Sequence, residues 1–456
     1  MRLTEIEVVY FIGIGGIGMS ALARYFHQHG KTVMGYDRTS SPLTTELEME
    51  GISVHFSDMV NDLPHIIRHT PKEKQLVIYT PAIPSTHGEL NWFRDNRYAV
   101  HKRSEVLGWI TNQGRSIAVA GTHGKTTTSS FVAHLLFSSD HGCNAFLGGI
   151  ASNYSTNFLF SNADAWNVIE ADEYDRSFLA LTPEIAVITS IDPDHLDIYG
   201  TAEEMRSTYR TFAKCVKPGG ILLLNDQIDF EGFSDYHTYG LSDHADYRCS
   251  RILIDGPKTY FDFVYPEGII EDLEISMPGF HNLNNACAAI TVAVLRGVDA
   301  NEIKNALKSF RGIARRYEYH VDTENHVYID DYAHHPTEIT ATIKAARASY
   351  PDKIITGIFQ PHLFSRTRDF GDEFAESLGL LDKIILLDIY PAREEPILGI
   401  DSQWLLDKIV SNNKKLVAKT QLLDALKSDP PEVLLTLGAG DIDRLAGPIS
   451  EWMKTL

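Results

Sequence analysis

The chain has few cysteines, and none of them belongs to a paired motif. Its 456 residues include only Cys143, Cys215, Cys249 and Cys287, and no two of these form a C-x-x-C pair. This spacing argues against both a zinc knuckle and a redox dithiol. We therefore expect free thiols in a reducing compartment.

Basic residues and long apolar runs are also scarce. The chain carries 41 Lys and Arg against 61 Asp and Glu, a formal net charge of −20. A broad nucleic-acid-binding surface needs dense basic residues, so we expect no nucleic-acid partner. The apolar stretch from Val8 to Ala23 could mimic a signal peptide, but four glycines interrupt it and an A-x-A cleavage site is missing. No other stretch approaches the roughly 20 apolar residues of a membrane span, so we expect a soluble cytoplasmic protein.

The chain does contain a repeated alternation of short apolar strands and helical segments. Hydrophobic residues make up 43 % of the sequence, which is ample for several packed cores. Alternation of this kind favours parallel sheets with crossover helices. The pattern restarts near residues 106 and 313, so we predict an α/β fold with domains at 1–105, 106–312 and 313–456.

The sharpest motif is a loop that follows an apolar strand and precedes a helix rich in small hydroxyl residues. Backbone N–H groups of such a loop, together with the helix N-terminus, can surround phosphate oxygens. Lys125 can neutralise the β- and γ-phosphates, and the Thr126 hydroxyl can bind Mg²⁺. Val119 occupies the first glycine position of the usual G-x-x-x-x-G-K-[ST] pattern. The predicted ATP-binding residues are Gly121, Thr122, His123, Gly124, Lys125, Thr126 and Thr127.

Two further polar residues follow apolar strands in the same part of the chain. Glu170 lies in VIEADEYD and His195 in DPDHLD. Strand carboxyl ends in an open α/β sheet share one crevice, so both side chains can lie near the phosphate loop. There they could hold Mg²⁺, although Mg²⁺ prefers oxygen to nitrogen ligands. Solvated acidic loops are the alternative.

A second glycine loop lies near the N-terminus. Gly13, Gly15 and Gly18 fit G-x-G-x-x-G between a strand and a helix, and Asp37 ends the next strand. This pattern is typical of a dinucleotide site and by itself favours a nicotinamide enzyme. A glycine turn at a helix N-terminus would equally hold the pyrophosphate of a UDP-sugar, so both ligands stay open.

Histidines and arginines gather in the last third of the chain. His334, His335 and Glu338 lack the H-x-x-x-H spacing of a zinc site, so we expect no zinc there. Two arginine pairs could bind carboxylates or phosphates in a bidentate manner, or could pair with surface acids. These pairs are Arg315 with Arg316, and Arg366 with Arg368.

Together these motifs resemble the Mur ligase family of peptidoglycan synthesis. The resemblance covers essentially the whole chain. It rests on nine ordered segments: GIGGIGMSALA, AGTHGKTTT, EADEYDRSFL, DHLDIYG, PGFHNLNNACAA, GIARRYE, DDYAHHPTEI, FQPHLFSRTRDF and DIYPAREEPI. It implies a Rossmann-like UDP-binding domain, a central ATPase domain with a mainly parallel sheet, and a Rossmann-like C-terminal domain. The family's phosphate loop also lacks the first glycine.

The resemblance also implies a reaction and its ligands. The matching members use ATP and Mg²⁺ to join L-alanine to the carboxylate of UDP-N-acetylmuramate through an acyl phosphate. Lys125, Glu170 and His195 would be the catalytic residues, and Thr126, Glu170 and His195 would hold the metal. Further ATP contacts would come from Asn282, Asn285, Arg315, Arg316 and Asp331. The UDP-sugar would lie along Gly13, Gly15, Gly16, Gly18, Asp37 and Arg103, and the muramoyl and amino-acid end near His334, His362, Arg366 and Arg368.

One departure from sibling ligases concerns a lysine that is carbamylated and bridges magnesium in several of them. The corresponding stretch here has Arg206 and Arg210 but no lysine. Arginine cannot form that carbamate, so a lysine-based metal bridge is not expected.

Three other functions stay open from the sequence. The first is the related ligase that attaches a whole tripeptide during wall recycling, although QPHLFSRTRDF and DIYPAREEPI favour the single-amino-acid enzyme. The others are a nicotinamide-dependent dehydrogenase and a non-catalytic nucleotide-binding regulator. The sequence leaves open a monomer or a homodimer, and the choice among alanine, glycine and serine.

Overall fold

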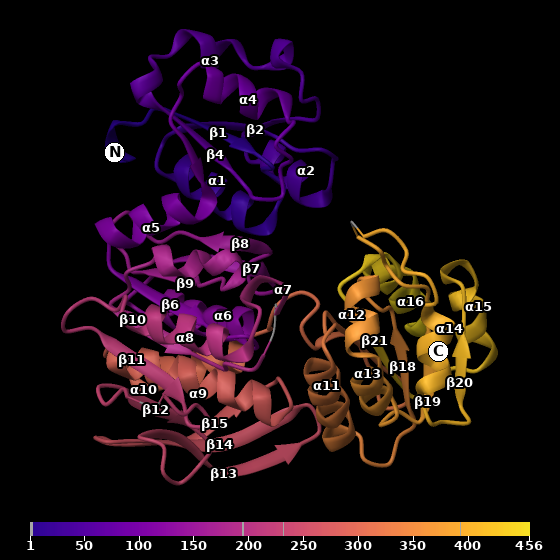
Figure 1. Cartoon of the computed structure of the whole chain (residues 1–456). Coiled ribbons are helices and arrows are strands. Elements are labelled where there is room, and N and C mark those ends of the chain that lie inside the picture. Colours follow the sequence, from indigo (N-terminus) through magenta and orange to yellow (C-terminus); the bar gives the residue numbers. More distant parts are fainter. Residues whose placement is uncertain (1–2, 194–195, 231, 393) are drawn as a thin grey trace. The chain divides into compact units, whose positions relative to one another are not determined.

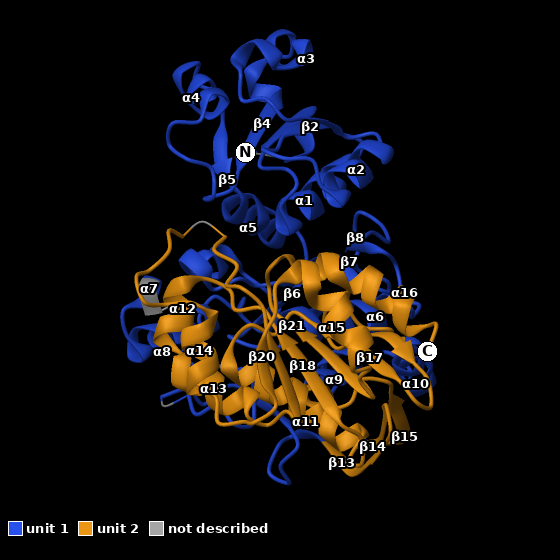
Figure 2. Cartoon of the chain, turned by 90° about the vertical axis from the view of Figure 1, so that its right-hand side faces the viewer, with its two compact units in different colours: residues 1–248, 263–269, 285–309 blue, residues 249–262, 270–284, 310–456 orange. Residues whose placement is uncertain are grey.

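The computed structural model describes residues 3–193, 196–230, 232–392 and 394–456 (Figure 1). The chain forms two compact units (Figure 2). The first comprises Met1–Arg248, Phe263–Ile269 and Asn285–Ser309, and the second comprises Cys249–Asp262, Ile270–Asn284 and Phe310–Leu456. No helix among the described residues is long and apolar enough to cross a membrane.

A five-stranded parallel sheet opens the first unit, in the order β3-β2-β1-β4-β5. The strands are β1 (Val8–Ile12), β2 (Thr32–Tyr36), β3 (Ser53–His55), β4 (Gln75–Tyr79) and β5 (Val100–Lys102). The helices are α1 (Ile17–Gln28), α2 (Pro42–Met49), α3 (His65–His69), α4 (Gly88–Asp95) and α5 (Arg103–Gln113). The strand order reverses between β1 and β4, so the loop after β1 lies at the switch point where such sheets bind ligands.

A buried polar cluster lies on one face of this sheet. The Glu89 side chain is fully buried, and Tyr10 donates a hydrogen bond of 2.7 Å to its Oε2. His55 Nε2 lies 3.3 Å from Glu89 Oε1 and 2.6 Å from the Tyr10 hydroxyl. Burial raises the pKa of Glu89 to about 7, with smaller contributions from Asp58 and Asp62, whereas the Tyr10 bond opposes the rise.

This cluster predicts a stability difference that changes with pH. Because the folded-state pKa of Glu89 exceeds its unfolded value, the protonated form stabilises the fold, and that contribution is lost as pH rises from about 4.5 to about 7. Glu89→Gln should remove this pH-dependent contribution. Between about pH 4.5 and pH 7 the unfolding free energy of the wild type should therefore fall, relative to that of the variant, by a few kcal/mol, at about 1.4 kcal/mol per pKa unit. Urea unfolding at pH 5 and pH 7.5 measures the difference, and an equal gap at both values would contradict it.

The second sheet has ten strands in the order β15-β14-β13-β12-β11-β10-β6-β9-β7-β8. Strand β6 pairs in parallel with β10 and β9, and β8 pairs antiparallel with β7, so the predicted mainly parallel sheet carries an antiparallel edge. The strands are β6 (Ser116–Ala120), β7 (Asn144–Ala151), β8 (Thr156–Leu159), β9 (Asn167–Glu170), β10 (Ile185–Ile188), β11 (Ile221–Asn225), β12 (His237–Gly240), β13 (Tyr247–Asp255), β14 (Lys258–Tyr265) and β15 (Gly268–Ile275). The helices of this region are α6 (Lys125–Phe137), α7 (Leu196–Tyr199), α8 (Ala202–Ala213), α9 (Phe280–Leu295) and α10 (Ala300–Ser309).

The third sheet belongs to the second unit and has the order β16-β17-β21-β18-β19-β20. The strand pairs of this sheet are all parallel except β16 with β17, which is antiparallel. The strands are β16 (Glu318–Asp322), β17 (Val327–Asp331), β18 (Ile355–Phe359), β19 (Lys383–Leu386), β20 (Lys414–Leu416) and β21 (Val433–Leu437). The helices are α11 (Pro336–Ser349), α12 (Phe364–Asp369), α13 (Gly371–Leu378), α14 (Ser402–Lys408), α15 (Leu422–Ser428) and α16 (Ala446–Met453).

Candidate active site

The phosphate loop joins β6 to α6, and its two glycines have conformations that other residues would strain. Gly121 has φ +141°, and a Cβ there would lie 2.0 Å from Thr189 Oγ1. Gly124 has φ +80°, and a Cβ there would lie 2.6 Å from Asn285 Oδ1. Only glycine fits both positions, so the loop can turn sharply and present the first N–H groups of α6.

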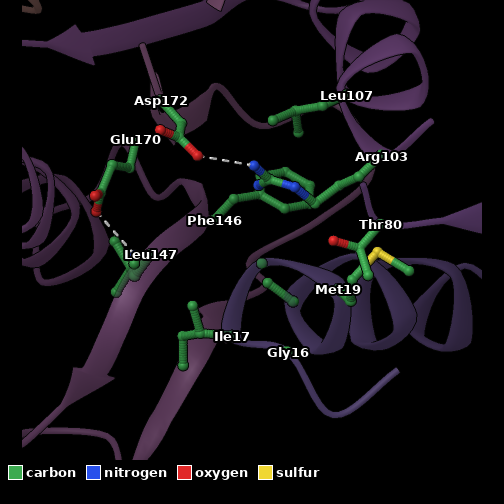
Figure 3. Close-up of a pocket in the computed structure, with 13 residues that line it drawn as sticks. Gly16, Ile17, Met19, Thr80, Arg103, Leu107, Phe146, Leu147, Glu170 and Asp172 are labelled. Atoms are coloured by element: carbon green, nitrogen blue, oxygen red, sulfur yellow. Dashed lines mark hydrogen bonds and ion pairs between the residues drawn. The ribbon is translucent and has the colours of Figure 1, made fainter. Parts of the chain in front are cut away.

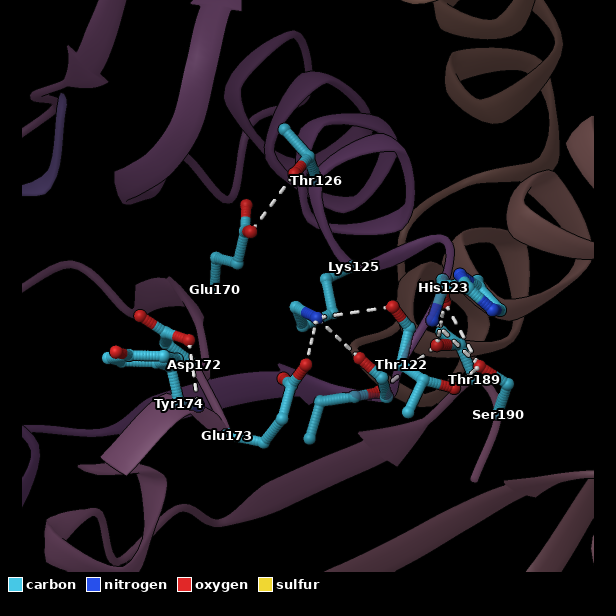
Figure 4. A network of polar contacts seen from close by, with 12 residues as sticks. Thr122, His123, Lys125, Thr126, Glu170, Asp172, Glu173, Tyr174, Thr189 and Ser190 are labelled. Atoms are coloured by element: carbon cyan, nitrogen blue, oxygen red, sulfur yellow. Dashed lines mark hydrogen bonds and ion pairs between the residues drawn. The ribbon is translucent and has the colours of Figure 1, made fainter. Parts of the chain in front are cut away.

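Lys125, the first residue of α6, is held by neighbours on three sides (Figure 4). Its Nζ donates to Gly121 O at 2.6 Å, to Thr122 O at 3.4 Å and to Glu173 Oε1 at 2.8 Å. Burial alone would lower the pKa of this ammonium, but the carboxylates of Glu173, Glu170 and Asp172 raise it above its ordinary value. The ammonium therefore stays charged beside the loop, where its charge can stabilise anionic oxygens.

Thr126 and Glu170, the two described residues predicted to hold magnesium, are in direct contact. The Thr126 hydroxyl donates to Glu170 Oε1 at 2.9 Å, and the N–H of Gly148 donates to Glu170 Oε2 at 3.0 Å. Glu170 ends β9, and β9 pairs with the strand that feeds the phosphate loop. A hydroxyl beside a carboxylate fits the oxygen ligands that Mg²⁺ prefers. His195 lies outside the described residues, so its metal role stays a prediction.

A cavity of about 340 Å³ lies between the first glycine loop and the end of β9 (Figure 3). Gly16 and Gly18 line it from the first loop and the start of α1, and Glu170 lines it from the end of β9. Arg103 lies beside Gly18, where a Cβ would come within 2.5 Å of its Nη1, and its Nη2 donates to Asp172 Oδ2 at 3.2 Å. One space thus joins the first glycine loop, the Arg103 guanidinium and Glu170, the carboxylate that Thr126 contacts.

Asp37, which directly follows β2, binds the first glycine loop through a backbone hydrogen bond. Its Oδ2 accepts a hydrogen bond of 2.7 Å from the N–H of Gly15, and its Oδ1 accepts one of 2.7 Å from the N–H of Arg38. A nicotinamide enzyme would use this carboxylate for a ribose hydroxyl. Here it braces the loop, and its contact with a UDP-sugar stays a prediction.

Two asparagines predicted to contact adenine lie on α9. Asn285 is buried beside the phosphate loop, where its Oδ1 accepts a hydrogen bond of 3.1 Å from the Thr128 hydroxyl. Asn282 is buried in the second unit, and its Nδ2 donates to Pro278 O at 2.9 Å. Both amides therefore have protein partners, and their contacts with adenine stay predictions.

In the second unit, the two arginines after the third-domain boundary bind acids that follow them in the chain. Arg315 has φ +62°, and its Nε donates to Asp330 Oδ2 at 3.1 Å. Arg316 Nη1 lies 3.6 Å from Glu338 Oε1. The Asp331 carboxylate accepts from the N–H of Ala333 at 2.8 Å, and burial raises its pKa to about 6. A nucleotide contact by any of these residues stays a prediction.

The two histidines predicted near the amino-acid end lie close together. The ring centroids of His334 and His362 are 6.1 Å apart. Burial lowers the pKa of each to about 4, and the positive charge of Arg366 acts in the same direction. Both rings are therefore neutral at pH 7. Arg368 is exposed and donates to Asp369 Oδ1 at 2.7 Å, so of the two α12 arginines Arg366 is the one near the histidines.

One group of described residues has metal-ligand atoms close enough together to share an ion, and Arg315 already donates hydrogen bonds to two of its members. The group is Glu318, His320 and Asp330 in the second unit. Arg315 donates through its backbone N–H to Glu318 Oε2 at 2.7 Å and through Nε to Asp330. Because the Arg315 guanidinium already pairs with Asp330, this group in the described part of the chain gives no support for a zinc site.

Three sequence profiles of one family match successive parts of the chain. "Mur ligase family, catalytic domain" matches residues 8–115, "Mur ligase middle domain" matches residues 119–293, and "Mur ligase, glutamate ligase domain" matches residues 315–440. Relatives named UDP-N-acetylmuramate--L-alanine ligase are similar over nearly the full length. The one from Cytophaga hutchinsonii is 50 % identical over 98 % of this chain and 97 % of its own, and the one from Porphyromonas gingivalis is 51 % identical over 98 % and 99 %.

The chain belongs to the Mur ligase family. A crystal structure of UDP-N-acetylmuramate-alanine ligase from Thermotoga maritima superposes with a TM-score of 0.81 at 26 % identity, covering 98 % of this chain and 99 % of that one. A murein peptide ligase from Psychrobacter arcticus has a TM-score of 0.68 at 22 % identity over 99 % of each chain, and it shares the fold. The predicted three-domain α/β Mur ligase architecture is confirmed.

Sequence reasoning missed two acids of this Mur ligase site. Glu173 pairs with Lys125, and Asp172 pairs with Arg103. Both stand in the EADEYD segment that had been singled out only for Glu170. The sequence does show a run of acids directly after a strand, and that run could have indicated ion pairs near the phosphate loop. It does not tell which acid pairs with which cation.

Proposed function

We propose that this chain is an ATP-dependent ligase that joins L-alanine to the carboxylate of UDP-N-acetylmuramate. The relatives that are about half identical over the full length carry this activity in their names. The observation that carries the proposal is the cavity lined by Gly16, Gly18 and Glu170, because Glu170 also accepts a hydrogen bond from Thr126 of the predicted ATP loop. A ligase must bring these two ligands together, whereas a dehydrogenase has no use for the second loop.

ATP is the proposed phosphoryl donor, held by the loop from Gly121 to Thr127. Thr126 and Glu170 would hold Mg²⁺, since their oxygens already lie 2.9 Å apart, and His195 would add a third ligand. Bound Mg²⁺ would neutralise charge on the phosphate oxygens. The sequence offers Arg206 and Arg210 rather than a lysine in the stretch where sibling ligases carry a carbamylated one.

The proposed chemistry has two steps. The muramoyl carboxylate attacks the γ-phosphorus of ATP, which forms an acyl phosphate and releases ADP. The unprotonated amine of L-alanine then attacks the acyl carbon, a C–N bond forms, and inorganic phosphate leaves. Lys125 would stabilise negative charge on the transferring phosphoryl group, and Arg103 would hold the UDP-sugar. Neither side chain becomes covalently attached to the substrate.

The proposal extends to domain roles. We assign UDP-sugar binding to residues 1–105, ATP binding to 106–312 and the amino-acid end to 313–456, where the neutral His334 and His362 lie near Arg366. The order of the three family matches, at 8–115, 119–293 and 315–440, supports this division of roles, although the first match extends ten residues past 105. Because the reaction uses ATP to make a cell-wall precursor, we place it in the cytoplasm.

One assay tests the proposed function directly. Incubation with ATP, Mg²⁺, UDP-N-acetylmuramate and one amine should give a product heavier by one amino-acid residue, measured by mass spectrometry, with alanine preferred over glycine and serine. The L-alanyl-γ-D-glutamyl tripeptide serves as the amine that a recycling ligase would use. Thermal protection by NAD without protection by the UDP-sugar would instead support a dehydrogenase. Phosphate release that needs neither UDP-sugar nor amine would contradict the ligase.

A further inference from the structure

A buried asparagine on β8 makes a polar network with one face of α1. Asn157 is fully buried, and its Nδ2 donates to Ile17 O at 2.5 Å and to Ser20 Oγ at 2.8 Å. Its Oδ1 accepts a hydrogen bond from Arg24 Nη1. The three partners are spaced by three and four residues, so they lie on the same side of the helix. Both polar ends of the Asn157 amide are therefore engaged by α1.

The network continues from Arg24 to a second helix. Arg24 is only 4 % exposed, and its guanidinium pairs with Glu50 at 2.7 Å and Glu46 at 3.2 Å. These carboxylates balance the buried cation, and the remaining guanidinium nitrogen reaches the Asn157 amide. A polar network that is fully satisfied inside a protein favours one arrangement of its parts, because any sliding would break several hydrogen bonds at once.

Apolar contacts alone would fix this helix less strictly. Tyr25 of α1 packs against Phe146 of β7 and Phe158 of β8, with ring centroids 5.3 Å and 6.1 Å apart. Aromatic contacts of this kind favour burial but tolerate small shifts, because the hydrophobic effect is not directional. Hydrogen bonds are directional, so those from Asn157 to Ile17 O and Ser20 Oγ fix the position of α1 along β8 in a way that the aromatic contacts do not.

The position of α1 matters because its first turn borders the cavity. Ile17 and Gly18 line the cavity from α1, and Phe146 and Gly148 line it from β7. Strand β7 pairs with β8 on one side and with β9, which ends at Glu170, on the other. Through Asn157, the helix that would hold the UDP-sugar pyrophosphate is thus attached to the sheet that carries the ATP site.

We infer that Asn157 is a positioning residue for the ligation, which rests on the proposed function. By holding the first turn of α1 to β8, it sets the distance between the muramoyl carboxylate and the γ-phosphate of ATP. Asn157 itself is absent from the cavity lining, so it acts through Ile17 and Ser20 rather than through contact with a substrate. A misplacement of about 1 Å between reacting groups can lower a rate by about 10²-fold.

The test compares Asn157→Leu with Asn153→Leu, a control in the same β7–β8 region whose amide donates instead to Ser309 O at 2.7 Å. We expect Asn157→Leu to lower kcat by about 10- to 100-fold, while the KM for ATP stays within about twofold because the phosphate loop is untouched. Ser20→Ala should give a smaller loss in the same direction and is less disruptive to folding. Asn153→Leu should keep the wild-type kcat.

A second readout does not depend on the reaction. Hydrogen–deuterium exchange at the amides of residues 17–24 should be faster in Asn157→Leu than in the wild type. Exchange in β6 and α6 should be unchanged. Folded Asn157→Leu and Ser20→Ala proteins that both retain wild-type kcat would overturn the positioning role, whatever their exchange rates. A wild-type protein that makes no product would instead overturn the proposed function. Even then, unchanged exchange in Asn157→Leu would refute the inference that Asn157 holds α1 to β8.

Discussion

Lys125→Ala is expected to lower the turnover of the proposed ligation by about 10²- to 10³-fold, the usual cost of removing one electrostatic donor from a transition state. The Lys125 ammonium lies at the start of α6, 2.8 Å from Glu173, and its raised pKa keeps it charged. When the phosphoryl group leaves ADP, that charge would stabilise the equatorial oxygens. Steady-state phosphate release with saturating UDP-N-acetylmuramate and L-alanine measures the loss.

Lys217→Ala is a matched control for this variant. Lys217 also donates to two backbone carbonyls, of Thr111 and Gly114, and pairs with a carboxylate, Glu184, at 2.9 Å. It is far in the sequence from the phosphate loop, and all three of its partners lie outside that loop. Its loss should reduce stability without a comparable loss of kcat. Equal turnover of Lys125→Ala and wild type would remove the phosphate-loop assignment.

Glu170→Gln should produce the second large effect, on the magnesium dependence. The glutamine retains an oxygen that can accept the Thr126 hydrogen bond but lacks the negative charge that a metal ligand supplies. We expect the Mg²⁺ concentration for half-maximal activity to rise at least about 10-fold. Mutation of residues that only support a metal ligand already lowers metal affinity by this factor, and a direct ligand should matter at least as much. A magnesium titration of initial rates at fixed ATP measures this shift.

The control for Glu170→Gln is Glu184→Gln. Glu184 is also a carboxylate that accepts a hydrogen bond from a backbone N–H, that of Ser116 at 2.6 Å. It directly precedes β10 and contacts the first residue of β6, whereas Glu170 lies beside the last residues of β6. Its variant should keep the wild-type magnesium titration. Binding of UDP-N-acetylmuramate, measured by calorimetry, should stay within a few-fold in both variants because the pyrophosphate loop is intact. Superimposable titrations for Glu170→Gln and wild type would count against the ligand role.

Several features could be predicted because they depend on local sequence. The phosphate loop needs glycine where the backbone turns sharply, and Gly121 and Gly124 have those conformations. Apolar strands before acidic loops predicted a parallel sheet whose carboxyl ends meet, and Thr126 and Glu170 indeed lie in contact. Nine ordered motifs identified the family, and the full-length relatives confirm it.

Other features depend on which side chains meet across distant segments, and local patterns do not contain that information. Nothing near Asp37 in the sequence shows that it braces Gly15, so the fingerprint equally predicted a ribose contact. Glu173, Asp172 and Glu170 stand within four residues, yet each meets a different partner because the loop after β9 turns.

Residue types and spacings along single stretches of chain were enough to identify the family, the α/β class and the two glycine loops. In three dimensions, Gly18 and Glu170 border one cavity, and Asn157 binds the first turn of α1 although it follows Ile17 by 140 residues in the sequence. Such contacts could not be read from the sequence, because hydrogen bonds and cavities depend on distances in space. Those distances are set by packing of the whole unit and not by neighbouring residues.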